Sequence, residues 1–99
     1  MIKFTKGWDE AYLGASSFED GSDPYYAVDE NIGIILVDAY GIWLYVYDDE
    51  NEISTEYAQR TKLNSSIAKF IVQGIELLND SQIYDWVRKF KVEAEVEEC

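Results

Sequence analysis

The chain has 99 residues, of which 47% are apolar and 15% aromatic, and its formal net charge is −12. A chain of this length can bury roughly 60–70% of the surface that it exposes when unfolded, which is enough for one hydrophobic core. The aromatic content argues against disorder. The absence of histidine removes the usual general base at neutral pH and the commonest metal ligand. We therefore expect a single domain over residues 1–99 that is not an enzyme.

The negative charge is concentrated in one part of the chain. Residues 7–59 contain thirteen Asp and Glu and no Lys or Arg, residues 60–91 contain three acids and six bases, and residues 92–99 add four Glu. A field of one sign weakens the compact state by self-repulsion, but it attracts cationic partners. The charge pattern therefore points to a function in binding a partner.

The N-terminal third has the weakest structural patterns. We expect a strand over residues 2–5, a short helix over 8–13, a loop over 18–24 and a further strand over 25–28. The N-terminus lacks the apolar stretch of a signal peptide, and the longest apolar run, residues 34–37, is too short to span a bilayer. With one cysteine, Cys99, no internal disulfide is possible, so we expect a cytoplasmic protein.

Residues 32–59 predict three antiparallel strands joined by tight turns. Residues 32–38 are β-branched and apolar, 42–48 mix aliphatic and aromatic residues, and 52–59 follow as a third strand. The first turn contains Gly41, which can adopt a positive φ, and the second is the acidic stretch 49–51.

The C-terminal part predicts two helices and a final strand. Residues 65–79 repeat at helical spacing, with one apolar stripe expected at Ile67, Phe70, Ile71, Gly74, Ile75 and Leu78. Asp80 and Ser81 are expected to cap a second helix over 82–90, and the alternation in 91–97 predicts a strand with Val92, Ala94 and Val96 inward. The predicted fold is an α+β domain in which an antiparallel meander of about three to five strands packs against two C-terminal helices.

The hairpin loop around Asp49 and Glu50 predicts the faces of the sheet. Pairing positions whose numbers sum to 99 gives a helix-facing side with Ile42, Leu44, Val46, Ile53, Thr55 and Tyr57. The opposite, second face then carries Trp43, Tyr45 and Tyr47 beside Glu52, Ser54 and Glu56, with Ile32, Ile34 and Leu36 from the first strand.

Two interpretations of this second face remain open. Residues 7–30 can cover it and leave the acids as a solvated rim, because contiguous apolar patches are rare on monomers. Alternatively, Tyr40, Tyr45 and Tyr47 stay open as anchors inside a negative field, since aromatic side chains are frequent at binding hot spots.

Motifs for chemistry are missing from the sequence. Cys99 follows two glutamates, which raise rather than lower a thiol pKa, and there is no phosphate-binding or dinucleotide-binding glycine pattern. The stretch 19–23 can hold a cation weakly, but the turn 48–52 lacks the glycine and distal glutamate of a calcium loop. We predict no catalytic residue, no metal and no cofactor. Direct binding to nucleic acid is disfavoured, because the acidic half has no Lys or Arg for phosphates.

The remaining interpretation is that carboxylates stand in for nucleic-acid phosphates. A strongly acidic surface can occupy a groove built for nucleic acid, with aromatic rings where bases would stack. The predicted partner-binding residues are Glu19, Asp20, Asp23, Asp29, Glu30, Tyr40, Tyr45, Tyr47, Asp48, Asp49, Glu50, Glu52 and Glu56. In size, charge and predicted layout the chain resembles the acidic inhibitors that phages use against CRISPR effectors, restriction enzymes or repair glycosylases, which share no motif or single fold.

Other functions remain open at this stage. An immunity or antitoxin protein that neutralises a cationic nuclease toxin uses the same electrostatics. A small adaptor domain whose acidity only maintains solubility is a third reading. We expect the partner to be a cationic nucleic-acid-binding protein or a toxin, with no membrane association, and the chain to be a monomer or a homodimer.

Overall fold

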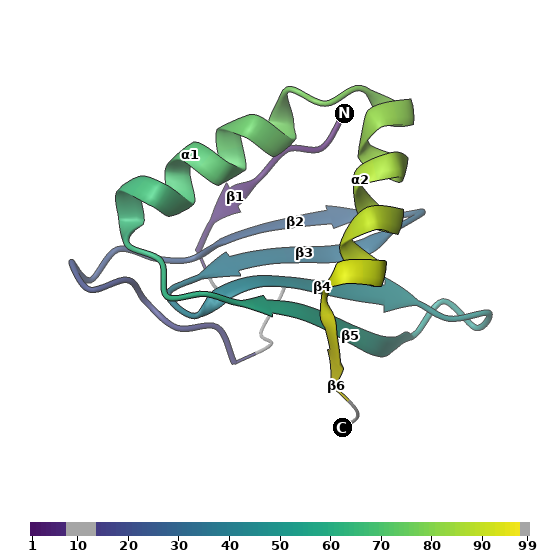
Figure 1. Ribbon diagram of the computed structural model, residues 1–99, viewed down its shortest axis with the longest axis horizontal. Coiled ribbons are helices and arrows are strands. Elements are labelled where there is room, and N and C mark those ends of the chain that lie inside the picture. The colour runs from purple at the N-terminus through teal and green to yellow at the C-terminus, as the bar shows by residue number, and fades with distance from the viewer. Residues whose placement is uncertain (8–13, 98–99) are drawn as a thin grey trace.

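The computed structural model describes residues 1–7 and 14–97, which form a six-stranded antiparallel sheet and two helices. The strands follow one another across the sheet in chain order: β1 (Thr5–Lys6), β2 (Tyr25–Asp29), β3 (Gly33–Asp38), β4 (Gly41–Tyr47), β5 (Ile53–Arg60) and β6 (Glu95–Glu97). Between β5 and β6, the helices α1 (Ser65–Glu76) and α2 (Asp80–Glu93) cover one face of the sheet (Figure 1). The predicted α+β meander with two helices is therefore confirmed.

The main core lies between the sheet and the helices. Alternate strand residues point toward the helices, so Ala27, Ile35 and Leu44 are buried in one cluster with α1 and α2. The helices contribute Ile75, Ile83, Val87 and Phe90 to this cluster. A second cluster under α1 joins Phe18, Val37, Ala39, Leu63, Ala68 and Val72. No helix in the described part of the chain is both long and apolar enough to cross a bilayer.

The opposite face of the sheet is also buried over β2, β3 and β4. Tyr26, Ile34, Leu36 and Tyr45 form a separate buried cluster, against which Ala15 and Trp43 pack. The prediction that Ile34, Leu36, Trp43 and Tyr45 share this face is confirmed. Ile32 was expected beside them, which is wrong, because it precedes the strand and packs in the helix-side core.

The register of the β4–β5 hairpin differs from the predicted one by two residues. Leu44 pairs with Tyr57, and Val46 pairs with Thr55. A shift of two keeps every side chain on its predicted face, because the side-chain period of a strand is two. A bulge between Val46 and Tyr47 then places Ile53 opposite Tyr47. Ile53 was expected in the core, but it is exposed, because the bulge ends the regular alternation.

Gly41 opens β4 with the positive φ that was expected. Its φ is +138°, and a Cβ at this position would lie 2.0 Å from the carbonyl oxygen of Gln59. Any side chain would therefore collide with the backbone of β5. Gly41 permits both the turn after β3 and the close pairing of β4 with β5.

Helix α1 buries part of the predicted stripe: Ile71, Ile75 and Leu78 pack on the core as predicted. The side-chain oxygen of Asn64 accepts a hydrogen bond from the Ile67 N–H (2.9 Å) and caps the helix, as expected for Asn64 or Ser65. Ala68, Val72 and Ile75 are buried, whereas Ile67 and Phe70 are exposed. The inward side therefore includes Ala68 and Val72 in place of Ile67 and Phe70, and part of the apolar surface of the helix stays uncovered.

Helix α2 is longer than predicted at both ends. Its N-cap is Asn79, whose side chain accepts from the Gln82 N–H (2.9 Å) while the Gln82 side chain accepts from the Asn79 N–H (3.0 Å). This capping box replaces the cap expected at Asp80 and Ser81. The helix continues to Glu93, so residues 91–93 are not a strand and Val92 is exposed rather than inward. The strand expected over residues 2–5 overlaps β1 only at Thr5, and the helix expected over 8–13 lies outside the described residues.

Candidate functional site

Two acidic turns lie at the same end of the sheet. Because neighbouring strands are antiparallel, the β2–β3 and β4–β5 turns share one end, and the β3–β4 turn lies at the other (Figure 1). The β2–β3 and β4–β5 turns together carry six carboxylates, from Asp29, Glu30, Asp48, Asp49, Glu50 and Glu52. We call these six residues the acidic end.

The β4–β5 turn is organised by Asp48. Its Oδ1 accepts hydrogen bonds from the backbone N–H groups of Glu50 (2.8 Å) and Glu52 (3.0 Å), and its own N–H donates to the Glu52 carbonyl (2.8 Å). Asn51 takes the left-handed conformation, with φ at 60°. Asp48 therefore holds the turn together, while Asp49, Glu50 and Glu52 are exposed.

The β2–β3 turn follows the same plan on a smaller scale. Asp29 Oδ1 accepts hydrogen bonds from the N–H groups of Asn31 (2.9 Å) and Ile32 (3.0 Å). Glu30 makes no comparable backbone contact among the described interactions and is exposed. In each turn, one aspartate fixes the backbone and the remaining acids face solvent.

The two turns act together electrostatically at ordinary salt concentrations. They are two strand spacings apart, about 10 Å. This is close to the Debye length of about 8–10 Å at 0.1–0.15 M salt, so their fields overlap for an approaching cationic surface. At about 1 M salt the Debye length falls to about 3 Å, and the turns become independent.

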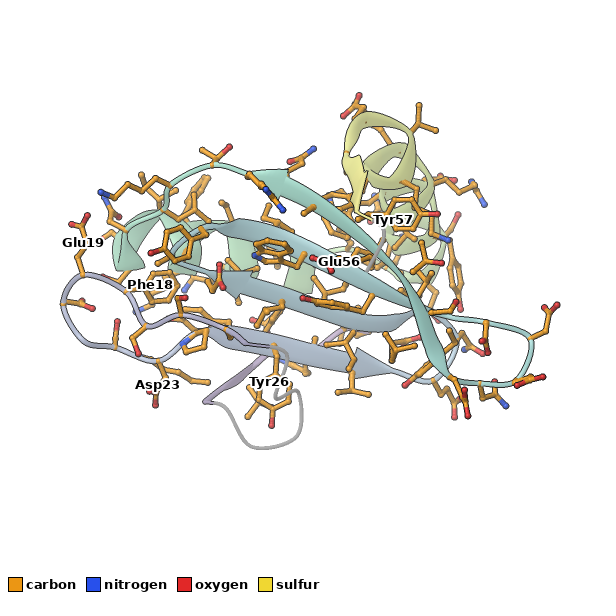
Figure 2. All side chains as sticks on the ribbon, turned by 90° about the horizontal axis from the view of Figure 1, so that it is seen from below. Phe18, Glu19, Asp23, Tyr26, Glu56 and Tyr57 are labelled. Atoms are coloured by element: carbon orange, nitrogen blue, oxygen red, sulfur yellow. The ribbon has the colours of Figure 1, made fainter. Side chains whose placement is uncertain are left out.

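The aromatic residues predicted at this site are only partly accessible. Tyr45 is 9% exposed and packs in the second-face cluster, so its predicted role as an open anchor is wrong. Ala15 and Trp43 pack against this cluster. Tyr47 is half-buried at the base of the β4–β5 turn, and Glu56 lies half-buried opposite Tyr45. Figure 2 shows Glu56 in the middle of the second face.

The other predicted residues lie at the opposite end of the sheet. Glu19, Asp20 and Asp23 belong to the loop before β2, which Figure 2 shows far from the β4–β5 turn. Tyr40 is 60% exposed in the β3–β4 turn. The structure therefore places six of the predicted residues at the acidic end, four at the opposite end, and Tyr45 and Glu56 within the second face.

Asp20 joins its loop to the start of α1. Its carboxylate accepts hydrogen bonds from the Ser22 hydroxyl, from the Ser65 hydroxyl (2.7 Å) and from the Ser22 N–H (3.0 Å). These bonds lower the pKa of the Asp20 carboxyl from 3.8 to about 2, the Ser22 hydroxyl having the largest effect. Glu19 also forms an exposed ion pair with Lys62 (3.4 Å).

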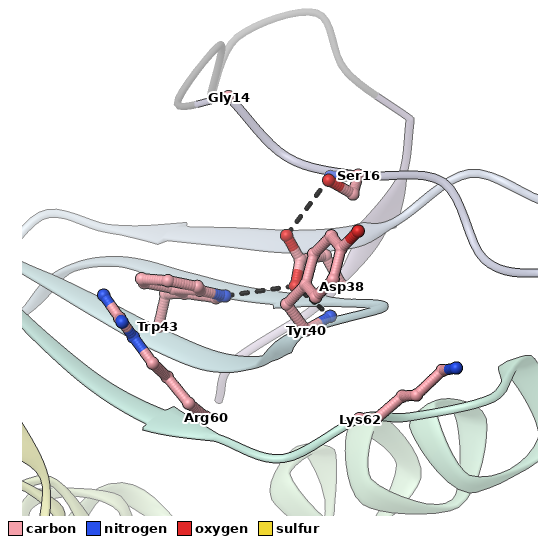
Figure 3. Close-up of a pocket in the computed structure, with 7 residues that line it drawn as sticks. All are labelled: Gly14, Ser16, Asp38, Tyr40, Trp43, Arg60 and Lys62. Atoms are coloured by element: carbon pink, nitrogen blue, oxygen red, sulfur yellow. Dashed lines mark hydrogen bonds between the residues drawn. The ribbon is translucent and has the colours of Figure 1, made fainter.

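A pocket of about 440 Å³ opens on the second face near the β3–β4 turn (Figure 3). Its lining residues are Gly14, Ser16, Asp38, Tyr40, Trp43, Arg60 and Lys62. The buried Asp38 carboxylate accepts hydrogen bonds from Ser16 N–H (3.2 Å), Tyr40 N–H (2.8 Å) and Trp43 Nε1–H (3.1 Å). Arg60 lies over the Trp43 ring at 5.5 Å.

The charged groups of this pocket already have partners within the chain. Asp38 accepts hydrogen bonds from the loop before β2, from the β3–β4 turn and from β4. Arg60 lies over the Trp43 ring, and Lys62 forms an ion pair with Glu19. We therefore interpret the pocket as a structural junction. Sequence reasoning did not identify Asp38, Arg60 or Lys62 at this junction. The one available signal was that Arg60 and Lys62 are the first cations after the acidic segment, residues 7–59.

The chain matches no protein-family model, no curated protein and no solved structure. Within residues 1–7 and 14–97, no group of three or more Cys, Asp and Glu side chains is placed to hold a metal ion.

Proposed function

We propose that this protein is a non-enzymatic inhibitor that binds a cationic nucleic-acid-binding protein through the acidic end and blocks access of DNA or RNA. The observation that carries the proposal is the gathering of six carboxylates from two separate turns at one end of the sheet. The partner in this proposal is a nuclease or a CRISPR or restriction effector in the cytoplasm.

The electrostatics of nucleic-acid grooves support this proposal. Such grooves neutralise phosphates with Lys and Arg, and release of counterions makes binding strongly dependent on salt. Carboxylates at the acidic end present the same sign of charge to those side chains. Long-range attraction also speeds association, which benefits an inhibitor that must compete with nucleic acid.

The rigidity of the turns supports the proposal as well. Asp29 and Asp48 fix the backbone through hydrogen bonds, so Glu30, Asp49, Glu50 and Glu52 project from ordered turns. An interface that is already ordered loses less conformational entropy on binding.

The test compares two double variants with the same change in charge. Asp49→Lys/Glu50→Lys alters the acidic end and spares Asp48, which holds the turn. Asp85→Lys/Glu93→Lys alters two exposed acids of α2 and serves as the control. Each immobilised protein is incubated with a bacterial lysate at low salt, and bound proteins are eluted with high salt or with added DNA and identified by mass spectrometry.

We expect wild type and the α2 control to retain a nucleic-acid-binding protein that added DNA or RNA displaces, and the acidic-end variant to lose it. Purified partner should then show inhibition at a one-to-one ratio. Equal losses in both variants would mean that only net charge matters and would contradict the assignment of the acidic end. A retained toxin that nucleic acid does not displace would instead support an immunity protein.

A further inference from the structure

The outer side of α1 carries an exposed apolar stripe. Ile67 and Phe70 are 47% and 77% exposed, and Leu77, the C-cap residue directly after the helix, is 84% exposed. Between them lies Gly74, where an added Cβ would meet no heavy atom within 4 Å. The spacing of three, four and three residues is the a/d repeat of a helix that packs along another helix. We call Ile67, Phe70, Gly74 and Leu77 the α1 stripe.

The α1 stripe is poor in charge, in contrast to most of the chain. Ser66 and Gln73 flank it on one side, and Lys69 is the cation of the helix. The acid of the helix, Glu76, accepts a hydrogen bond from the Phe4 N–H (2.9 Å) and is half-buried. The helix therefore brings no exposed carboxylate of its own to this face, although each copy has a net charge of −12.

We propose that the α1 stripe binds a second copy of this chain, with the two α1 helices antiparallel around a twofold axis at Val72. Reversal about residue 72 exchanges position 67 with 77 and position 70 with 74. Ile67 then meets the partner's Leu77, and Phe70 fills the space above the partner's Gly74. A twofold interface must be self-complementary in this way, and a large residue facing the smallest one meets that requirement.

The size of the stripe predicts a weak dimer. With roughly 200 Å² for a fully exposed large side chain, the three apolar residues leave roughly 400 Å² uncovered per copy. Two copies bury roughly 800 Å² from these residues, and the flanking residues bring the total toward the lower limit of specific interfaces, about 1,200 Å². We expect a dissociation constant of roughly 1–100 μM.

The antiparallel arrangement also separates the acidic ends. Helix α1 starts at the end of the sheet where Ser65 contacts Asp20 and runs toward the acidic end (Figure 1). In the partner the helix runs the opposite way, so the two acidic ends point away from each other. The dimer is independent of the proposed inhibitor function, and it would give that function two binding ends.

Sedimentation equilibrium from roughly 1 to 500 μM tests the proposal. Phe70→Gln/Leu77→Gln removes the large residues without changing charge, and we expect at least tenfold weaker association with an unchanged circular dichroism spectrum. Val92→Gln, at an α2 residue that is 85% exposed, is the control and should associate like wild type. Gly74→Leu has open space in the monomer, so it should fold normally but lose the recess for Phe70.

Cross-linking tests the register. In a Cys99→Ser background, an equal mixture of Ile67→Cys and Leu77→Cys chains should form mixed disulfides faster than either chain alone. Preferential 67–67 or 77–77 disulfides would overturn the antiparallel arrangement. A wild-type chain that stays monomeric at 500 μM, or a dimer that none of the stripe variants weakens, would overturn the α1 interface. If the wild-type chain is monomeric and the stripe variants still lose the captured nucleic-acid-binding protein, the stripe binds that protein instead and the dimer is overturned.

Discussion

Four aspartates of the acidic segment each accept a hydrogen bond from the backbone N–H two residues further along the chain. They are Asp20, Asp29, Asp38 and Asp48. The short aspartate side chain reaches this N–H easily, whereas glutamate is too long for the same turn. Four of the thirteen acids of residues 7–59 therefore have a structural role, and the acids that remain open at the acidic end are Glu30, Asp49, Glu50 and Glu52.

Asp20 should make the stability of the fold sensitive to acid. Its pKa is lowered to about 2 in the folded state from 3.8, so its stabilising effect is complete above about pH 4 and is lost as the pH falls toward 2. We expect Asp20→Asn to unfold at a lower denaturant concentration than wild type at pH 7, and the difference to disappear near pH 2.

Chemical denaturation of both proteins at several pH values measures this difference, and the titration of other carboxyls cancels to first order. Ser65→Ala is the matched variant, because it removes one of the hydrogen bonds but keeps the charge. It should raise the Asp20 pKa partway toward 3.8 in an NMR titration. A constant difference between wild type and Asp20→Asn from pH 7 to pH 2 would contradict the role of the Asp20 carboxylate.

At the scale of elements, the sequence predicted the strands more accurately than it predicted the buried side of helix α1. Strands β3, β4 and β5 could be predicted because their apolar runs are bounded by turn residues such as Gly41. The inward side of α1 could be predicted only in part, through Ile71, Ile75 and Leu78, because apolar residues nearly surround that helix. Packing against the sheet then selected Ala68 and Val72 over the larger Phe70. Burial of a helix depends on the shape of the surface beneath it as well as on hydrophobicity.

The N-terminus of α2 gives a prediction at this scale. Asn79 forms a reciprocal capping box with Gln82, whereas Ser81 lies inside the first turn. We expect Asn79→Ala to lower the free energy of unfolding by about 1 kcal/mol, because the Gln82 N–H at the helix start loses its side-chain acceptor. Ser81→Ala is the control and should change stability by less than about 0.5 kcal/mol. Denaturant unfolding measures both, and a larger effect at Ser81 would restore the cap first predicted there.

At the scale of the whole molecule, the acidic segment was visible in the sequence but its shape was not. The thirteen acids of residues 7–59 identify a negative half of the chain. Only the strand order shows that Asp29 and Asp48 lie at one end of the sheet and Asp20 at the other. Sequence spacing cannot supply this, because residues 30 and 50 become neighbours through the pairing of β3 with β4. The cluster that contains Tyr45 likewise includes a contact with Ala15, which is distant in the sequence.

The net charge of −12 predicts how salt affects folding. The molecule measures 38 × 30 × 25 Å, so at 0.01 M salt, where the Debye length is about 30 Å, most of its charges repel one another. At 0.1 M the length is about 10 Å, and repulsion across the molecule is screened. Because the folded state holds these charges closer together than the unfolded state, we expect the melting temperature to rise by about 4–8 °C over this range, equivalent to about 1 kcal/mol.

Calorimetry in sodium chloride at neutral pH measures this rise, and Asp49→Lys/Glu50→Lys provides the matched comparison. This variant reduces the net charge to −8, so it should melt at a higher temperature than wild type at 0.01 M salt and respond less to added salt. Non-electrostatic effects of the salt are the same for both proteins and cancel in the difference. If the melting temperatures of the two proteins rise in parallel with salt, repulsion at the acidic end does not limit stability. If the two melting temperatures converge at 0.1 M salt, these acids lower the stability of the fold in the absence of a cationic partner.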